Sequence, residues 1–282
     1  ENIGIDDEDS VSLEDKQADR KERDLHIAVL RTPKISNFTD FDCLAGEADV
    51  SLYYVTETKE LGQPDLILLP GSKNTTEDMM YLRDSGLESA IQTAVAKGTP
   101  LMGICGGYQM LGEEIRDPHH TESSYDGVKG MGLLEMTTTF SPEKLTSQVE
   151  ADCHDWPFLG TKISATGLKG YEIHMGETSF TGTDDYHPLT ITRRAGETCA
   201  VTEGTGRADG LIFGTYIHGI FDHDEFRRQI LNALRQKKGL PPLTSTRSVA
   251  AEKQRSYDQL AAVVRRSLDM DKIRAIMGLG SK

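Results

Sequence analysis

The stretch PLMGICGGYQMLG, residues 100–112, decides the fold class of this chain. A short apolar run leads into Cys105, two glycines follow, and a helix-like segment begins. This pattern is typical of a buried strand that turns sharply into a helix. Three further short runs are apolar or rich in β-formers, at residues 25–30, 50–55 and 65–70. We therefore expect four short strands in the first part of the chain.

Helix-like segments separate these strands. Residues 75–83 and 87–97 are helical candidates, and Gly98 follows the second of them as a helix C-terminus often requires. Alternating strands and helices predict an α/β fold with a mostly parallel central sheet and helices on both faces. Ligands of such sheets bind beyond the carboxyl ends of the strands, where residues 69–75 and 103–107 are expected to lie.

The middle of the chain changes character. Residues 132–140, 162–175, 189–194 and 199–202 alternate as β-strands do, with few helical candidates between them. They predict an antiparallel β extension or the far side of the central sheet. Residues 209–222 then read as another buried strand and turn.

The two ends of the chain differ from its centre. Residues 1–24 hold 10 acidic and 4 basic side chains and lack a hydrophobic period, so we expect an acidic linker or a disordered end. Residues 25–240 are expected to form the main domain. Residues 241–282 are expected to be a helical extension packed on it.

Two helices are expected after the last strand. The first covers residues 224–238 and stops at a glycine followed by two prolines. The second covers residues 248–268, and its apolar stripe is most simply explained by core packing, although it could contact a partner; the stripe consists of Leu260, Val263, Val264 and Leu268.

Composition excludes several classes of protein. The 282 residues include 31 basic and 45 acidic side chains, a formal charge of −14, so nucleic acid is not an expected partner. The four cysteines lie far apart without paired spacing, which argues against disulfides and structural zinc. No apolar stretch reaches the roughly 20 residues that a membrane span needs. We expect a cytoplasmic protein that does not contact membranes.

The glycines around Cys105 have the spacing of a nucleophile elbow, in which Gly103 and Gly107 stand two residues before and after the nucleophile. The turn also places Cys105 at a helix N-terminus, where partial positive charge favours the reactive thiolate. Buried free cysteines that only fill space are common, however. This motif alone leaves both interpretations open.

Two neighbouring strand ends favour catalysis. Gly71 lies in a tight Pro-Gly-Ser turn, and its N–H with that of Gly106 could form an oxyanion hole. His218 closes another predicted strand and could serve the cysteine as base and proton donor. We therefore predict Cys105 and His218 as the catalytic residues.

Candidates for substrate binding are less specific. Ser72 belongs to the same turn as Gly71, and Gln109 and Tyr108 lie one turn into the helix after Cys105, where they could line a pocket or pack on the sheet. His174 and Glu172 share a strand face and could line that pocket or form a structural pair. We predict no metal site.

Several motifs together resemble a known family, the CobQ/CobB-type branch of class I glutamine amidotransferases. Within this branch the chain is similar to the C-terminal glutaminase domain of cobyric acid synthases. The motifs are GICGGYQMLG (103–112), GTYIHGIFD (214–222), RTPKISNFTDFDCL (31–44), LPGSKNT (69–75), YEIHMG (171–176) and the acidic EDSVSLED (8–15).

The resemblance implies a flavodoxin-like, class I amidotransferase-like fold and a defined reaction. Cys105 attacks the side-chain amide of glutamine, ammonia leaves with a proton from His218, and water hydrolyses the thioester. The ammonia serves ATP-dependent amidation of adenosylcobyrinic acid a,c-diamide. ATP, magnesium and this corrinoid bind an N-terminal synthetase half of the same polypeptide, whose phosphate-binding loop has no match in this sequence.

One position departs from the wider class. Many class I glutaminases carry a glutamate two residues after the histidine, which orients the imidazole, whereas this chain has Ile220 there. The sequence therefore does not identify a third member of the triad, and we expect His218 to be poorly oriented until the synthetase half docks. Two other functions remain open: a glutaminase that serves another acceptor, such as a cell-wall lipid precursor, and a catalytically silent docking module.

Overall fold

The centre of the molecule is a seven-stranded sheet. The computed structural model describes residues 22–182, 185–244 and 247–279. From one edge to the other the strands are β11 (Asp185–Tyr186), β14 (Thr205–Arg207), β15 (Ile212–Thr215), β6 (Leu101–Ile104), β4 (Leu66–Leu69), β1 (Leu25–Leu30) and β3 (Val50–Val55). The five strands from β15 to β3 are parallel, and β14 and β11 add an antiparallel edge. The predicted mostly parallel sheet is confirmed.

Helices cover both faces of this sheet. The chain steps from β1 to β3 in one direction and from β3 through β4 to β6 in the other, and right-handed crossovers therefore place the intervening helices on opposite faces. One face carries α1 (Asp42–Ala45) and α6 (Asp224–Lys237). The other carries α2 (Thr58–Leu61), α3 (Thr75–Asp84), α4 (Leu87–Ala96) and α5 (Gly106–Leu111).

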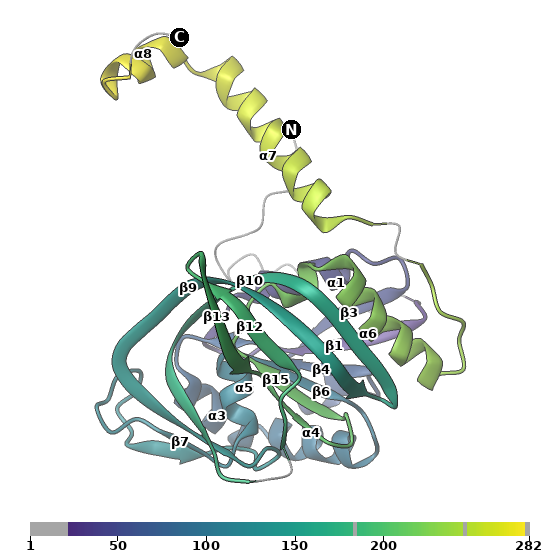
Figure 1. Ribbon diagram of the computed structural model, residues 1–282. Coiled ribbons are helices and arrows are strands. Elements are labelled where there is room, and N and C mark those ends of the chain that lie inside the picture. Colours follow the sequence, from purple (N-terminus) through teal and green to yellow (C-terminus); the bar gives the residue numbers. More distant parts are fainter. Residues whose placement is uncertain (1–21, 183–184, 245–246, 280–282) are drawn as a thin grey trace.

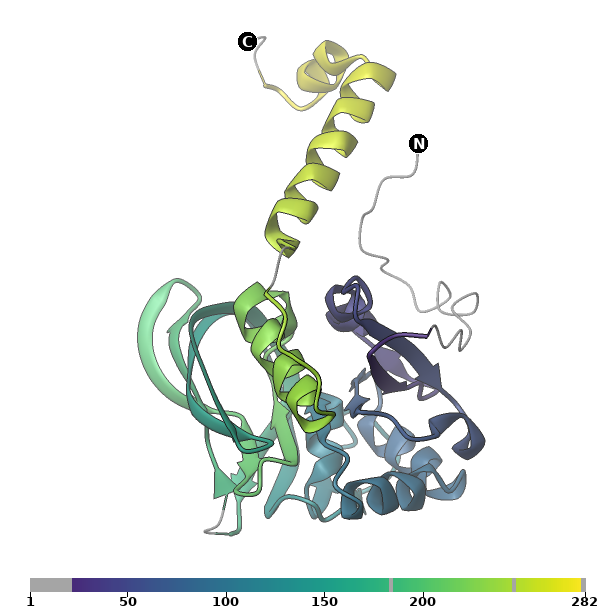
Figure 2. The same cartoon turned by 90° about the vertical axis from the view of Figure 1, so that its right-hand side faces the viewer.

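A second, six-stranded sheet stands beside the first. Its order is β13 (Glu197–Glu203), β12 (Leu189–Arg194), β9 (Met136–Phe158), β7 (Glu114–Arg116) and β8 (Gly127–Lys129), with β10 (Thr161–Phe180) also paired to β9. The long β9–β10 hairpin curves over the molecule in Figure 1, and α6 lies between it and β1 (Figure 2). The expected antiparallel extension is confirmed; the alternative, that these residues form the far side of the central sheet, is wrong.

The two sheets share one apolar core. Trp156 of β9 makes ring contacts with Phe158, with Phe213 of β15 and with Phe226 of α6, at centroid distances of 4.9, 4.5 and 6.1 Å. All four rings are buried. Burying a large aromatic side chain contributes about 2–3 kcal/mol. This cluster therefore fixes α6 and the β9–β10 hairpin against the central sheet.

A buried ionic network attaches α6 to the start of β3. The Arg228 guanidinium donates two hydrogen bonds of 3.0 Å to Asp49, and Arg227 donates one of 2.7 Å to Glu47. The two carboxylates and both guanidinium groups are buried. Removing one member would leave an unpaired buried charge, so the network specifies the position of α6.

The C-terminal helices differ from the expectation. The predicted helix exists as α7 (Val249–Ser267), followed by α8 (Met270–Ile276), but the pair projects away from the domain (Figures 1 and 2). Val249 is the only buried residue of either helix. Of the stripe, Leu260 is 38% and Leu268 51% exposed. The expected packing is therefore wrong: at 1.5 Å per residue, Leu260 lies about 16 Å beyond Val249 along a helix that leaves the domain.

The contacts of α7 with the domain come from its N-terminal residues. Lys253 forms an ion pair of 2.8 Å with Asp222, and the Val249 N–H donates to Asp224 at 3.1 Å. Of the predicted acidic segment, residues 1–21 lie outside the described residues. Within the described part of the chain, no helix is both long and apolar enough to cross a membrane.

Candidate active site

Cys105 occupies the turn between β6 and α5. Its φ of +51° lies in a region that residues with a side chain rarely adopt, so the backbone is strained there. A Cβ on Gly103 would lie 2.6 Å from the Gly107 carbonyl, and a Cβ on Gly107 would lie 2.1 Å from the Leu69 carbonyl oxygen. The glycines at both positions therefore permit the close contact of α5 with β4 and β6, as the elbow pattern predicts.

His218 follows β15, and its side chain is fully buried. Its Nδ1 lies 2.7 Å from Oδ2 of Asp40, and the other oxygen of Asp40 accepts a 2.9 Å hydrogen bond from the Gly219 N–H. Asp40 belongs to the short 3-10 helix η2 (Phe38–Phe41), which follows β1. The carboxylate that Ile220 cannot supply thus comes from Asp40, far away in the sequence. The expectation that His218 is poorly oriented until the synthetase half docks is therefore wrong, because Asp40 already holds the imidazole.

The surroundings of His218 favour its protonated form. Burial lowers the pKa of the imidazole, but the Asp40 carboxylate and the nearby Cys105 outweigh it and raise the pKa to about 10. The second ring nitrogen, Nε2, is buried and has no hydrogen-bond partner among the described residues. An imidazolium whose free N–H is available to reacting groups is suited to protonate a leaving amine.

The predicted oxyanion-hole residues lie together. Gly71 and Ser72 form the short strand β5, which pairs with β2 (Ile35–Ser36) at the carboxyl end of β4. A Cβ on Gly106 would lie 2.8 Å from the Ser72 nitrogen, and one on Gly71 would lie 3.4 Å from the His218 ring. Four adjacent strand ends, those of β1, β4, β6 and β15, therefore supply Asp40, Gly71, Cys105 and His218.

A cavity of about 440 Å³ opens beside Cys105. Three of the predicted substrate-binding residues line it: Ser72, Gln109 and His174. The Cys105 thiol faces the Ile173 carbonyl of β10 at 3.5 Å. Charged side chains also line the cavity, namely Lys73, Glu122 and Lys144. The cavity thus offers both signs of charge to a ligand whose reacting end would meet the thiol.

Two predicted substrate-binding residues do not line this cavity. Tyr108 is buried against the sheet, where its hydroxyl is hydrogen-bonded to Thr205 at 2.5 Å. Glu172 is buried and accepts two hydrogen bonds, of 3.0 and 3.2 Å, from Arg194 of β12. Glu172 Oε1 lies 3.9 Å from His174 Nε2, so the pair shares a face as expected, but only the histidine reaches the cavity.

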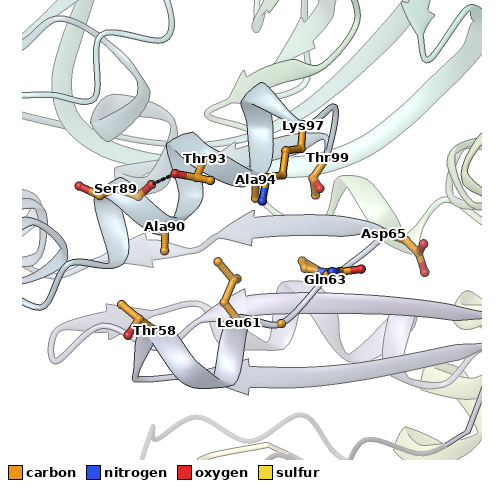
Figure 3. Close-up of a pocket in the computed structure, with 12 residues that line it drawn as sticks. Thr58, Leu61, Gln63, Asp65, Ser89, Ala90, Thr93, Ala94, Lys97 and Thr99 are labelled. Atoms are coloured by element: carbon orange, nitrogen blue, oxygen red, sulfur yellow. Dashed lines mark hydrogen bonds between the residues drawn. The ribbon is translucent and has the colours of Figure 1, made fainter.

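A second cavity, of about 630 Å³, lies between α2 and α4 (Figure 3). It extends to Asp65 and Thr99, the residues near the amino ends of β4 and β6. Its labelled lining includes Ala94 and Thr93, and neither a cysteine nor a histidine contributes to it. In the described ranges, no group of three or more His, Cys, Asp or Glu side chains could hold a metal ion.

Comparison with known proteins agrees with this geometry. The family model of the CobB/CobQ-like glutamine amidotransferase domain matches residues 26–226. Cobyric acid synthases from Moorella thermoacetica and Klebsiella pneumoniae are each 45% identical over 98% of this chain, covering 53% and 54% of their own lengths. The enzyme of that name from Dehalococcoides mccartyi is 44% identical over 99% of the chain. The chain thus spans about half the length of these relatives.

Solved structures share the fold at low identity. PurLQS from Thermotoga maritima aligns with a TM-score of 0.56 and 17% identity over 76% of this chain and 99% of that chain. A crystal structure of a glutamine amidotransferase aligns with a TM-score of 0.50 and 17% identity over 74% and 98%. The fold, the strand-end cysteine and histidine, and the family match lead to one conclusion: the chain belongs to the family of CobB/CobQ-like glutamine amidotransferase domains.

Proposed function

We propose that this chain is the ammonia-producing half of a cobyric acid synthase and hydrolyses glutamine through a thioester on Cys105. The observation that carries the proposal is the buried contact between Asp40 and His218 beneath the strained Cys105 turn. A cysteine, a histidine and an orienting carboxylate in this order form the usual group for acyl transfer through a thiolate.

The first step forms the thioester. The Cys105 sulfur attacks the side-chain amide carbon of glutamine, and the negative charge that develops on the carbonyl oxygen is stabilised by the N–H groups of Gly71 and Gly106. His218 then gives its proton to the amide nitrogen as the carbon–nitrogen bond breaks, and ammonia leaves. Asp40 holds the imidazole by its other nitrogen and stabilises its positive charge throughout this step.

The second step regenerates the enzyme. Neutral His218 accepts a proton from a water molecule that attacks the thioester carbon, and glutamate leaves as the thiolate re-forms. The cavity residues Ser72, Gln109 and His174 would contact the bound glutamine. All four cysteines of the chain are free, which is the state that the reducing cytoplasm maintains, and we propose the cytoplasm as the location of the protein.

The acceptor of the ammonia is proposed from the relatives. Because their names are cobyric acid synthase and this chain spans about half of their length, we assign ATP, magnesium and the corrinoid adenosylcobyrinic acid a,c-diamide to the other half. The sequence contains no G-x-x-x-x-G-K-[ST] loop that would hold ATP phosphates in this half. The N-terminal synthetase half is therefore the expected partner.

Covalent labelling tests the glutaminase. The chain is incubated with diazo-oxo-norleucine, a glutamine analogue with an electrophilic carbon, and its intact mass is measured with and without the synthetase half. We expect one adduct in the wild type and none in Cys105→Ala. An unlabelled wild type under both conditions would indicate a silent docking module. Labelling without amidation of the corrinoid by the complete enzyme would indicate another acceptor.

A further inference from the structure

Tyr171 of β10 packs directly on the catalytic histidine. The two rings are stacked, with centroids 5.0 Å apart and planes inclined by 16°. The Tyr171 N–H donates to the His218 carbonyl at 3.2 Å, and the His218 N–H donates to the Tyr171 carbonyl at 2.8 Å. A Cβ on Gly170 would lie 2.3 Å from the His218 carbonyl oxygen, so this approach depends on glycine. Backbone and side chain together hold the His218 loop against β10.

The far end of the tyrosine contacts the loop that carries Asp40. The Tyr171 hydroxyl accepts a 2.7 Å hydrogen bond from the side-chain amide of Asn37. Asn37 has a φ of +52° and directly precedes η2, the short helix that contains Asp40. One side chain therefore contacts both loops whose relative position sets the bond between His218 and Asp40.

Tyr171 also separates the histidine from solvent. Its side chain is 37% exposed and lines an outer cleft of about 640 Å³, whereas His218 behind it is fully buried. Gly219 and Asp222, which follow the histidine, line the same cleft. Water reaching the bond between His218 and Asp40 would compete for both groups and weaken it.

We propose that Tyr171 is a positioning residue for glutamine hydrolysis: its ring sets the plane of the His218 imidazole, and its bond to Asn37 keeps Asp40 at Nδ1. This inference rests on the proposed function of Cys105 and His218. A positioned acid or base typically contributes about 10²–10⁴-fold to a rate, and a misplaced one retains part of this factor. Loss of the tyrosine ring should therefore lower kcat by about 10- to 100-fold.

Three variants of the 282-residue chain separate the effect of the Tyr171 ring from that of its hydroxyl. Tyr171→Leu removes the stacked ring, Tyr171→Phe keeps it but loses the bond to Asn37, and Asn37→Gly loses the same bond while tolerating the positive φ. We expect Tyr171→Leu to lower kcat by about 10- to 100-fold. Its KM for glutamine should stay within about twofold of the wild-type value, since the ring does not line the substrate cavity. In Tyr171→Phe and in Asn37→Gly, kcat should fall by only about threefold. The variant that combines both substitutions should show the same loss of kcat, since both remove the same hydrogen bond.

A spectroscopic measurement completes the test without glutamine turnover. The proton between His218 and Asp40 should give a far-downfield NMR resonance that is absent in His218→Gln, retained in Tyr171→Phe and broadened or lost in Tyr171→Leu. An unchanged resonance and kcat in Tyr171→Leu would overturn the proposal. The proposal would also be overturned if Tyr171→Phe lost as much kcat as Tyr171→Leu while Asn37→Gly kept its kcat, because the hydroxyl, and neither the ring nor the bond to Asn37, would then be responsible. If the wild type fails to hydrolyse glutamine, the proposed function fails, while the resonance still decides the role of Tyr171.

Discussion

Two cavities that lie at opposite ends of the central strands differ in what surrounds them. The one beside Cys105 lies at the carboxyl ends of the strands and measures about 440 Å³; the one between α2 and α4 is larger, about 630 Å³, and reaches the amino ends. The smaller cavity contains a strained cysteine, and behind it lies a buried histidine whose pKa is raised by the Asp40 carboxylate. The larger one is lined by side chains such as Thr93 and Ala94 (Figure 3).

This difference shows that cavity size does not locate the chemistry. In a parallel sheet the carboxyl ends of all strands lie on the same side. The loops that follow β1, β4, β6 and β15 therefore meet there, although their residues are far apart in the sequence. At the opposite end, the cavity is lined by residues of α2 and α4 and of the loops that precede β4 and β6. If function is confined to the carboxyl ends of the strands, substitutions there should impair glutamine hydrolysis and substitutions at the amino ends should not.

The largest effect is expected at Asp40. Asp40→Asn keeps the shape of the side chain but removes the charge that holds His218 protonated, and its amide N–H can face Nδ1 and favour the wrong imidazole tautomer. We expect kcat for glutamine hydrolysis to fall by about 10²–10⁴-fold with little change in KM. Steady-state kinetics measure this. Asp42→Asn, two residues on, is the matched control and should keep activity; equal losses in both would mean that the loop, not the carboxylate, matters.

The sequence predicted the cysteine and the histidine of the candidate site but not the carboxylate, Asp40, that binds the histidine. The elbow glycines and the strand-end histidine carry local patterns, and the structure places Cys105 and His218 at the ends of the neighbouring strands β6 and β15, close enough for Cys105 to affect the pKa of His218. Asp40 lies 178 residues before His218, in a turn where neither periodicity nor spacing distinguishes one acidic residue from the next. Its signal lay only in the motif that resembles the family.

The errors in the prediction have physical reasons too. For Glu172 the sequence leaves two alternatives, lining the pocket or forming a structural pair, because strand alternation gives the face of a side chain but not its partner. In the structure Arg194, from a distant part of the chain, binds both carboxylate oxygens. For Tyr108 the sequence could not decide between lining the cavity and packing on the sheet, because the six-residue helix α5 has one side toward each. The stripe of α7 predicted the helix correctly, yet an amphipathic pattern does not specify which surface covers it.

Stability should depend on pH through His218. Its pKa in the folded protein is about 10, against an ordinary value of 6.5, so the folded state holds this proton more tightly than the unfolded chain. The stabilisation is complete below about pH 6.5 and is lost as the pH rises through about 10. Urea unfolding of the wild type and His218→Gln at pH 6.5, 8 and 10 measures it. The free-energy difference between them should shrink with pH; a constant difference would contradict the assignment.

Backbone strain at Cys105 predicts a smaller effect. Cys105→Gly and Cys105→Ala both remove the proposed nucleophile, but only glycine adopts the positive φ without cost. We therefore expect Cys105→Gly to be more stable than Cys105→Ala by about 1 kcal/mol, measured by urea unfolding. Ala94→Gly, in the last turn of α4, should have the opposite sign. A Cys105→Gly variant less stable than Cys105→Ala would show that the turn is not strained.

The smallest effect is expected from filling the amino-end cavity. Ala94→Met places a flexible apolar side chain into the space between α2 and α4, and kcat and KM for glutamine should stay within about twofold of the wild type. The matched variant Ser36→Met fills the cavity beside Cys105 instead, where we expect KM to rise by about tenfold or more because the side chain occupies volume that glutamine needs. Thermal unfolding of both variants controls for misfolding. A normally folded Ala94→Met variant that impaired hydrolysis as much as Ser36→Met would contradict the prediction. The change would then have to reach Cys105 from the amino ends of the strands through the helices between the two cavities.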